Sequence, residues 1–220
     1  MKQPTTSFAV RAFAGGCLLA AAALLGSCKK DQPETPAPAP LAVYAAGYQT
    51  NAVGRRVATV WKNGVATVLS DGTTDVQASA LAVAGADVYA AGYEINAAGQ
   101  RVAKTWKNGV ATTLSGGTTD AQANALAVAG TDVYVVGFEI NAAGPLVAKI
   151  WKNGTATALS DGTRRAGANA VALAGPNVYV AGYEANAAGQ YVATVWKNGT
   201  ATALTDGTRD ATVFALVLAL

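Results

Sequence analysis

The chain has 220 residues, of which 51% are hydrophobic and 13% are charged, and its formal net charge is +3. At this length roughly 70% of the unfolded surface can be buried, so a core can form without disulfides or metal. The few charges are spread along the chain, which argues against a nucleic-acid-binding protein. The absence of histidine removes the commonest general base and metal ligand, so no catalytic, cofactor or metal site is predicted.

Residues 1–27 have the features of an export signal, because two basic residues precede an apolar run from 13 to 25. That run is shorter than the roughly 20 residues of a membrane span. It ends in Leu-Gly-Ser-Cys at 25–28, which resembles the lipobox of bacterial lipoproteins. The resemblance implies cleavage before Cys28, lipid on Cys28 and a membrane partner reached through that lipid. An ordinary secretory signal and an uncleaved anchor are the alternatives.

A short linker follows, with four prolines between residues 31 and 40. Proline excludes both helix and sheet ladder, so residues 28–40 are predicted to be an extended stalk behind the lipidated cysteine. The Lys-Lys-Asp sequence at 29–31 resembles the start of surface lipoproteins of some Gram-negative bacteria. The resemblance implies the outer membrane, with the periplasmic and the cell-surface side both open. Removal of the leader leaves 14 basic and 13 acidic side chains.

The rest of the chain repeats with a period of 45 residues, as the four tryptophans at 61, 106, 151 and 196 mark. Within one unit, 87–94 alternates like a strand, and a second strand is predicted over 101–106. The Asn-Gly pair at 108–109 is a strong signal for a tight hairpin leading into a third strand over 110–114. A short apolar run at 124–130 completes four strands per unit.

Four antiparallel strands in each unit predict an all-β fold, a four-bladed β-propeller over residues 41–220. The domain begins at the second strand of a unit and ends, at 214–220, with an innermost strand. We therefore expect the C-terminal strand to pair with the first unit and close the ring. An assembly of two chains into eight blades, and a shortened relative of a larger propeller, remain open alternatives.

The repeated sequence motifs Val-Tyr, Trp-Lys-Asn-Gly and Asp-Gly-Thr resemble those of poorly characterised propeller-type bacterial lipoproteins. This resemblance supports the fold and implies no activity. The Asp-Gly-Thr motifs could be calcium loops, but Gly116 and Arg165 each stand where other units have an aspartate. A turn is therefore the sufficient explanation for these motifs. The tryptophans could stack on sugars, but packing between blades is the expected role.

Loops at the two ends of the strands give the propeller two faces. The Lys-Asn-Gly face is nearly identical in every unit, whereas the opposite face, called here the variable-loop face, differs between units. Such loops on a rigid support can acquire binding functions, although relaxed constraint would give the same pattern. An anionic or hydroxyl-rich partner is expected to contact the following residues: Arg56, Arg101, Arg164, Arg165, Tyr191 and Arg209, with Glu94, Glu139 and Glu184 nearby.

The function expected from these observations is that of a non-catalytic binding or scaffolding module on the cell envelope, with a glycan or a protein as its ligand. The glutamates raise the alternative of a glycan-cleaving enzyme, since glycosidases use paired carboxylates. Each glutamate ends a strand before a polar loop, however, so a solvated position is the expectation. A shortened duplication product without a selected ligand is the third hypothesis.

Overall fold

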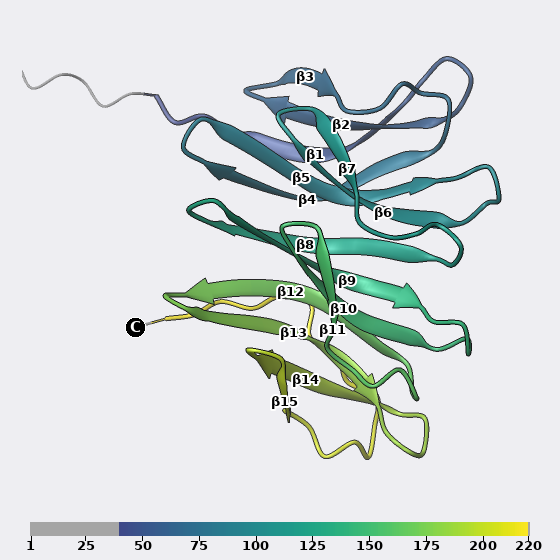
Figure 1. The fold of residues 1–220 in the computed structure, drawn as a ribbon. Coiled ribbons are helices and arrows are strands. Elements are labelled where there is room, and N and C mark those ends of the chain that lie inside the picture. Colours follow the sequence, from purple (N-terminus) through teal and green to yellow (C-terminus); the bar gives the residue numbers. More distant parts are fainter. Residues whose placement is uncertain (1–39, 220) are drawn as a thin grey trace, which may run out of the picture. The chain divides into compact units, whose positions relative to one another are not determined.

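A computed structural model describes residues 40–219 of the chain, and a single unit begins at Leu41. The expected signal peptide, the lipid site at Cys28 and nearly all of the linker lie outside the described residues. The described part is all-β, and its sheets are stacked in chain order (Figure 1). It contains no helix that is long and apolar enough to cross a membrane.

The strands form four antiparallel sheets. The first sheet has only three strands, β1 (Tyr44–Thr50), β2 (Arg56–Lys62) and β3 (Val65–Val68). The second consists of β4 (Val76–Ala84), β5 (Asp87–Ile95), β6 (Arg101–Lys107) and β7 (Val110–Thr113). The third consists of β8 (Ala121–Ala129), β9 (Asp132–Ile140), β10 (Leu146–Lys152) and β11 (Thr155–Ala158). The fourth consists of β12 (Ala166–Ala174), β13 (Asn177–Ala185), β14 (Tyr191–Lys197) and β15 (Thr200–Ala203).

The predicted Asn-Gly hairpins are confirmed in all four sheets. Asn108 has a φ of 50° and Gly109 a φ of 84°, and the asparagines of the other three turns have φ values of 49° or 50°. A type I′ turn requires positive φ at both central residues and matches the twist of the strands that it joins. The Asn108 side chain also accepts a hydrogen bond from the Val88 backbone at 2.8 Å, which ties the turn to the neighbouring strand.

The innermost strands begin earlier than the sequence pattern predicts. The third sheet has this strand at Ala121–Ala129 instead of 124–130, because residues 121–123 also pair with β9, beyond a β-bulge between Ala123 and Ala125. The same bulge occurs in β4 and β12. Opposite each bulge lies a glycine such as Gly137, where an added Cβ would be 1.9 Å from the backbone oxygen of Gln122. The glycine therefore allows the bulged backbone to pass.

The core lies between successive sheets, where three of the four tryptophans pack as expected. Trp106, Trp151 and Trp196 are at most 2% exposed, and each lies in a cluster with small apolar residues of the preceding sheet. Ala58 and Val60 of the first sheet pack against Trp106, for example. Large aromatic rings fill the space that the alanines leave, so each sheet buries its neighbour's face.

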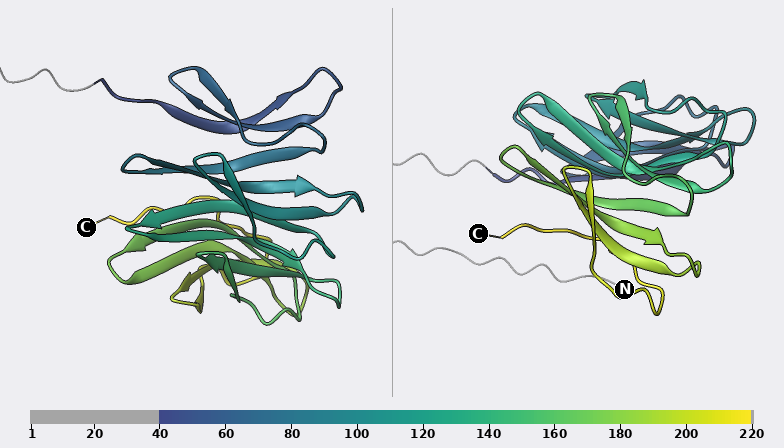
Figure 2. Two further views of the ribbon diagram at one scale, coloured as in Figure 1. Left: turned by 45° about the horizontal axis from the view of Figure 1, so that its top comes forward. Right: turned by 60° about the horizontal axis from the view of Figure 1, so that its bottom comes forward.

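The expected pairing of the C-terminal segment with the first sheet is not seen. Residues 211–219 lie instead on the fourth sheet, where the Val213 backbone donates to the Gly182 oxygen at 3.1 Å. Figures 1 and 2 place β1–β3 at one end of the stack and the fourth sheet with this segment at the other. The stack of described sheets is therefore open, and the first sheet lacks an innermost strand.

Candidate functional site

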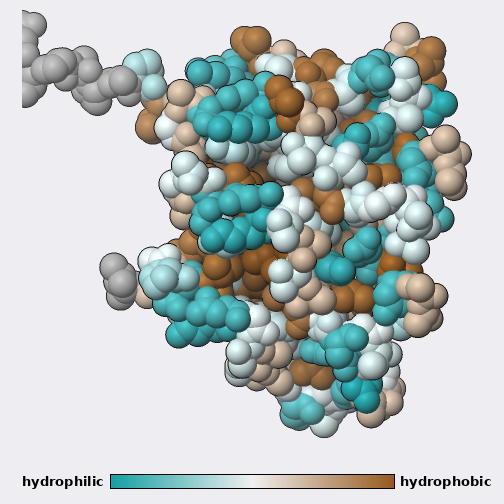
Figure 3. Space-filling model, in the orientation of Figure 1, coloured by the Kyte–Doolittle hydropathy of each residue, from teal (hydrophilic) through white to brown (hydrophobic). Residues whose placement is uncertain are grey.

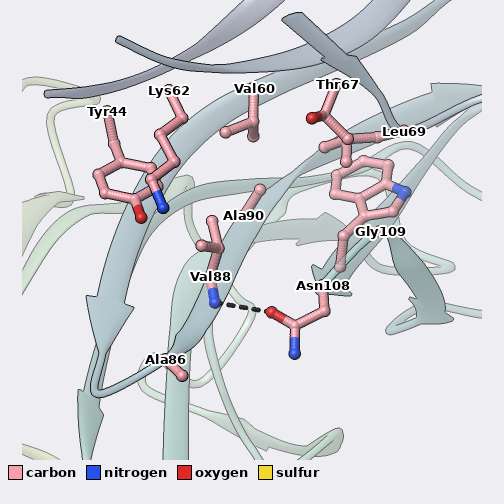
Figure 4. Close-up of a pocket in the computed structure, with 11 residues that line it drawn as sticks. Tyr44, Val60, Lys62, Thr67, Leu69, Ala86, Val88, Ala90, Asn108 and Gly109 are labelled. Carbon is pink, nitrogen blue, oxygen red and sulfur yellow. Dashed lines mark hydrogen bonds between the residues drawn. The ribbon is translucent and has the colours of Figure 1, made fainter. Parts of the chain in front are cut away.

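Three equivalent grooves lie between successive sheets on the Lys-Asn-Gly face. They enclose about 250, 190 and 210 Å³, in chain order. Figure 4 shows the first, with Tyr44, Lys62 and Thr67 on one wall and Val88 and Asn108 on the other. Residues 45 and 90 positions later line the second and third grooves, which makes the groove a property of the repeat. The two further sets are Tyr89, Lys107, Thr112, Val133 and Asn153, and Tyr134, Lys152, Thr157, Val178 and Asn198.

Each groove has an apolar floor and a polar rim. Leu69, Val88 and Ala90 supply apolar surface in the first groove, while Asn108 and Gly109 form the turn at its mouth. The sides come from two different sheets, so the width is set by the packing between sheets. Hydrophobic side chains are visible between hydrophilic bands along the left of Figure 3, which is the side of these turns in Figure 1. Such a mixed lining suits a small ligand with both apolar and hydroxyl surface.

A lysine lies over the tyrosine ring in every sheet, with its Nζ atom 5.2–5.5 Å from the ring centroid. Lys107 also pairs with Asp87 at 2.8 Å, and Lys152 pairs with Asp132 at 2.7 Å. The hydrogen bond from Lys107 lowers the pKa of Asp87, and Asp87 raises the pKa of Lys107. Both groups are therefore charged over a wide pH range. The aspartate is absent from the first and fourth sheets, where Ala42 and Asn177 take its place.

The variable-loop face is built around two kinds of turn. The Asn96 side chain donates to the Gly117 oxygen at 2.8 Å, which joins the loop before β6 to the loop after β7. The Asp71 carboxylate accepts bonds from the Thr73 backbone and hydroxyl, and these lower the pKa of Asp71. Asp161 and Asp206 accept equivalent bonds. The Asp-Gly-Thr motifs thus form turns, as predicted.

Several of the predicted binding residues on this face are engaged within the protein. Arg101 pairs with Asp120 at 3.1 Å and donates to Gln122 at 2.8 Å. Burial alone would raise the pKa of Asp120, but the bonds from Arg101 outweigh it and lower that pKa. Arg56 lies 4.8 Å over the Tyr48 ring.

Tyr191 packs on Tyr183, with 4.5 Å between the ring centroids. The remaining predicted arginines, Arg164, Arg165 and Arg209, are exposed on the variable-loop face. Arg56 is exposed as well, but its guanidinium lies over the Tyr48 ring.

The three predicted glutamates do not share one environment. Glu94 pairs with Lys104, and Glu139 pairs with Lys149 at 3.3 Å. In the fourth sheet Thr194 takes the place of the lysine. Partial burial raises the pKa of Glu184, and the charge of Asp161 adds to this shift. Glu94 lines a cavity of about 210 Å³ with Asp71 and Lys104, and Glu139 lines one of about 240 Å³ with Lys149.

Sequence reasoning missed the grooves, although the 45-residue spacing of the tyrosines and lysines was visible. The spacing alone did not predict a site, because each groove is formed by side chains from two successive sheets. Which of these side chains face each other cannot be read from the spacing. Comparison with models of known protein families gave no match, and comparison with curated proteins gave none either.

Proposed function

We propose that this chain is a non-catalytic, multivalent binding module of the bacterial cell envelope, and that it binds hydroxyl-rich ligands such as glycans in the grooves between its sheets. The observation that carries the proposal is the repetition of one groove three times at the 45-residue period. Several weak copies of a site give high avidity for a ligand that repeats along a polymer or a surface.

The chemistry of the groove fits a sugar ring. The apolar floor offers a surface to the C–H face of the ring, and the asparagine, threonine and lysine offer hydrogen-bonding groups to its hydroxyls. This assignment places the ligand on the face opposite to the one that divergence between the repeats favours.

The variable-loop face is the second candidate surface, for an anionic partner. Arg164, Arg165 and Arg209 are exposed there. The position of Arg165 in the third unit is aspartate in the other three units. The positive charge on this part of the face is therefore specific to the third and fourth units.

The finer features of the chain are part of the same proposal. The sheets belong to a propeller-type ring in which the C-terminal segment supplies a missing innermost strand. A lipid on Cys28 attaches the module to the outer membrane through the proline-rich linker, as the lipobox resemblance implies. Metabolic labelling with a fatty acid tests the anchor, since Cys28→Ala should abolish the label.

A glycan array probed with the full-length chain in detergent tests the binding proposal. We expect binding to at least one class of glycan, and we expect its loss in the triple variant Thr67→Arg, Thr112→Arg, Thr157→Arg. These threonines are exposed and line the three grooves, so arginine fills the grooves without disturbing the core. The matched control is Val68→Arg, Thr113→Arg, Ala158→Arg, in the same strands but outside the grooves.

The two surfaces are separated by charge reversal of Arg164 and Arg165. A ligand lost in that variant, and kept in the groove variant, would move the site to the variable-loop face. A folded chain that binds no glycan on the array would contradict the sugar assignment.

A further inference from the structure

The C-terminal segment occupies the position of the first strand of a fifth sheet. In the third sheet the Asn124 side chain donates to the Ala168 oxygen of β12 at 2.9 Å. In the fourth sheet Asn169 donates in the same way to the Val213 oxygen at 2.8 Å. Each member of the second pair lies 45 residues after its counterpart, so residues 211–219 lie on the fourth sheet as β12 lies on the third.

The first sheet lacks this same strand and keeps the space for it. Gly92, Gly137 and Gly182 each face a bulged inner strand, and an added Cβ would be 1.9 Å from its backbone oxygen. Gly47 occupies the equivalent position in β1, but there the nearest atom to an added Cβ is in the Trp61 ring, at 3.4 Å. Within the described chain, Gly47 therefore has no inner strand opposite it, whereas Gly92, Gly137 and Gly182 each face one.

The two ends of the stack also leave apolar groups uncovered. Trp61 is half-buried, whereas the other tryptophans are at most 2% exposed. Leu204 is 56% exposed, while the equivalent Leu114 and Leu159 are 8% and 9% exposed. In the complete interfaces, the tryptophan of one sheet packs against this leucine of the sheet before it, as Trp196 does with Leu159. Trp61 and Leu204 are therefore the two halves of one missing interface.

We propose that a second copy of this chain completes the interface. Residues 211–219 of one copy pair with β1 of the next, and the first sheet of that copy stacks on the fourth sheet of the first copy. A partner of the same sequence fits because each end presents what the other lacks: a strand and an exposed leucine at one end, a strand gap and a half-buried tryptophan at the other.

Pairing within one chain is disfavoured by the repetition of the interface. The three sheet-to-sheet contacts use equivalent residues, so each sheet is rotated by a similar amount relative to the one before it. This repeated rotation leaves the two ends of the stack apart (Figure 2). Two copies provide eight sheets, which is within the usual range of propeller rings. The contact is head-to-tail, and it ends in a closed ring when the last copy meets the first.

This assembly would also create a fourth groove. Its walls would be Tyr179, Lys197 and Thr202 of one copy and Val43 and Asn63 of the other, which are the 45-residue equivalents of the third groove and of the first. The groove is incomplete in a single chain, so assembly increases the number of sites. The interface itself does not depend on the nature of the ligand.

The first test measures the mass of the full-length chain in detergent by sedimentation. We expect a dimer, and we expect Gly47→Ala to be a monomer with an unchanged circular dichroism spectrum. The added methyl group fits the single chain but would clash with the incoming Thr212 oxygen, the equivalent of the oxygens that face Gly92, Gly137 and Gly182. A monomeric wild type would overturn the proposal, as would a Gly47→Ala variant that still forms the wild-type assembly.

A second pair of variants tests the stacked faces. Leu204→Glu places a charge on the exposed leucine and should also give a monomer. Val110→Glu changes a residue that is 70% exposed in an outer strand, away from the proposed interface, and should remain a dimer. Loss of the dimer in both variants, or in neither, would contradict the assigned surface.

Cross-linking then identifies which chain supplies the strand. The pairs Leu81–Ala90, Leu126–Val135 and Val171–Val180 set the register, so Leu216 is expected opposite Ala45. Leu216→Cys and Ala45→Cys are placed on separate chains that carry serine at 17 and 28, and the two proteins are mixed under oxidising conditions. A disulfide-linked heterodimer supports the proposal, and its absence overturns it. A further variant carries both cysteines in one chain. If it forms a disulfide within that chain and no linked dimers, the C-terminal strand pairs with the chain's own first sheet.

Discussion

Gly116 interrupts the series of turn aspartates, and this allows the turn to be tested at a single residue. In the other units Asp71, Asp161 and Asp206 accept bonds from the threonine two positions later. Gly116 has no positive φ, and an added Cβ would meet nothing within 4 Å. We expect Gly116→Asp to stabilise the fold through bonds from Thr118, with about 0.4–1 kcal/mol more from the loss of glycine freedom in the unfolded chain.

Gly116→Ala separates the two contributions, because alanine restricts the unfolded chain without accepting a bond. The pH dependence follows from the aspartates already present, whose pKa is lowered by bonds from threonine. The aspartate's part of the gain should be present above the unfolded-state pKa, near 3.8, and should vanish as the pH falls through the lower folded-state pKa. Urea unfolding at several pH values measures the free energy of unfolding of each variant. An equal gain in stability in Gly116→Asp and Gly116→Ala would mean that the hydrogen bonds contribute nothing.

Glu184 predicts the opposite pH dependence, because burial raises its pKa in the folded protein. A raised pKa disfavours the charged form in the folded state, so stability is lost as the pH rises through the folded-state pKa. We expect Glu184→Gln to stabilise the protein slightly at pH 7, by at most about 0.5 kcal/mol, with no difference at pH 3. Glu139→Gln is the matched control, because it removes the partner of Lys149 and should give no gain at pH 7.

At the scale of the strand, the glycines opposite the bulges should be among the least replaceable residues. Gly92→Ala would place a methyl group 1.9 Å from the Gln77 backbone oxygen, and neither strand can move without breaking the ladder. We expect a loss of about 3 kcal/mol or more, measured by thermal or urea unfolding. The control is Gly47→Ala, measured as a monomer, where the same change should cost well under 1 kcal/mol. Equal losses at the two positions would contradict the role assigned to the inner strand.

These strands also mark how far sequence reasoning reaches. Hairpins at Asn108 and its equivalents follow from local rules on positive φ, and the burial of Trp106, Trp151 and Trp196 follows from their position in a half-buried strand. The bulge at Ala123 could not be predicted, since it depends on the opposing Gly137 and on the strand that passes it. The open stack could not be predicted either, because the rotation between successive sheets depends on how Ala58 and Trp106 pack across two units. For the same reason, the site residues chosen from divergent loops included Arg101, which the structure shows bonded to Asp120 and Gln122.

For the whole molecule, the repeat architecture makes stability a sum over sheets and the interfaces between them. The third sheet is covered on both faces, by the second sheet and by the fourth. The first sheet has three strands and a half-buried Trp61 at its open face. Amide hydrogens exchange more slowly where the local structure is more stable, so in a monomer those of β2 should exchange faster than those of the equivalent β10.

Hydrogen exchange measured by mass spectrometry on the wild type and on Gly47→Ala tests this expectation. In Gly47→Ala, peptides covering 56–62 should exchange at least ten-fold faster than peptides covering 146–152, which are protected by one further interface. In the wild type the second copy covers the first sheet, so the two rates should approach each other. Fast exchange of 56–62 in both proteins would mean that this end of the stack is open in solution. Slow exchange in both would mean that the first sheet needs no cover, because its own three strands and its contact with the second sheet are then sufficient.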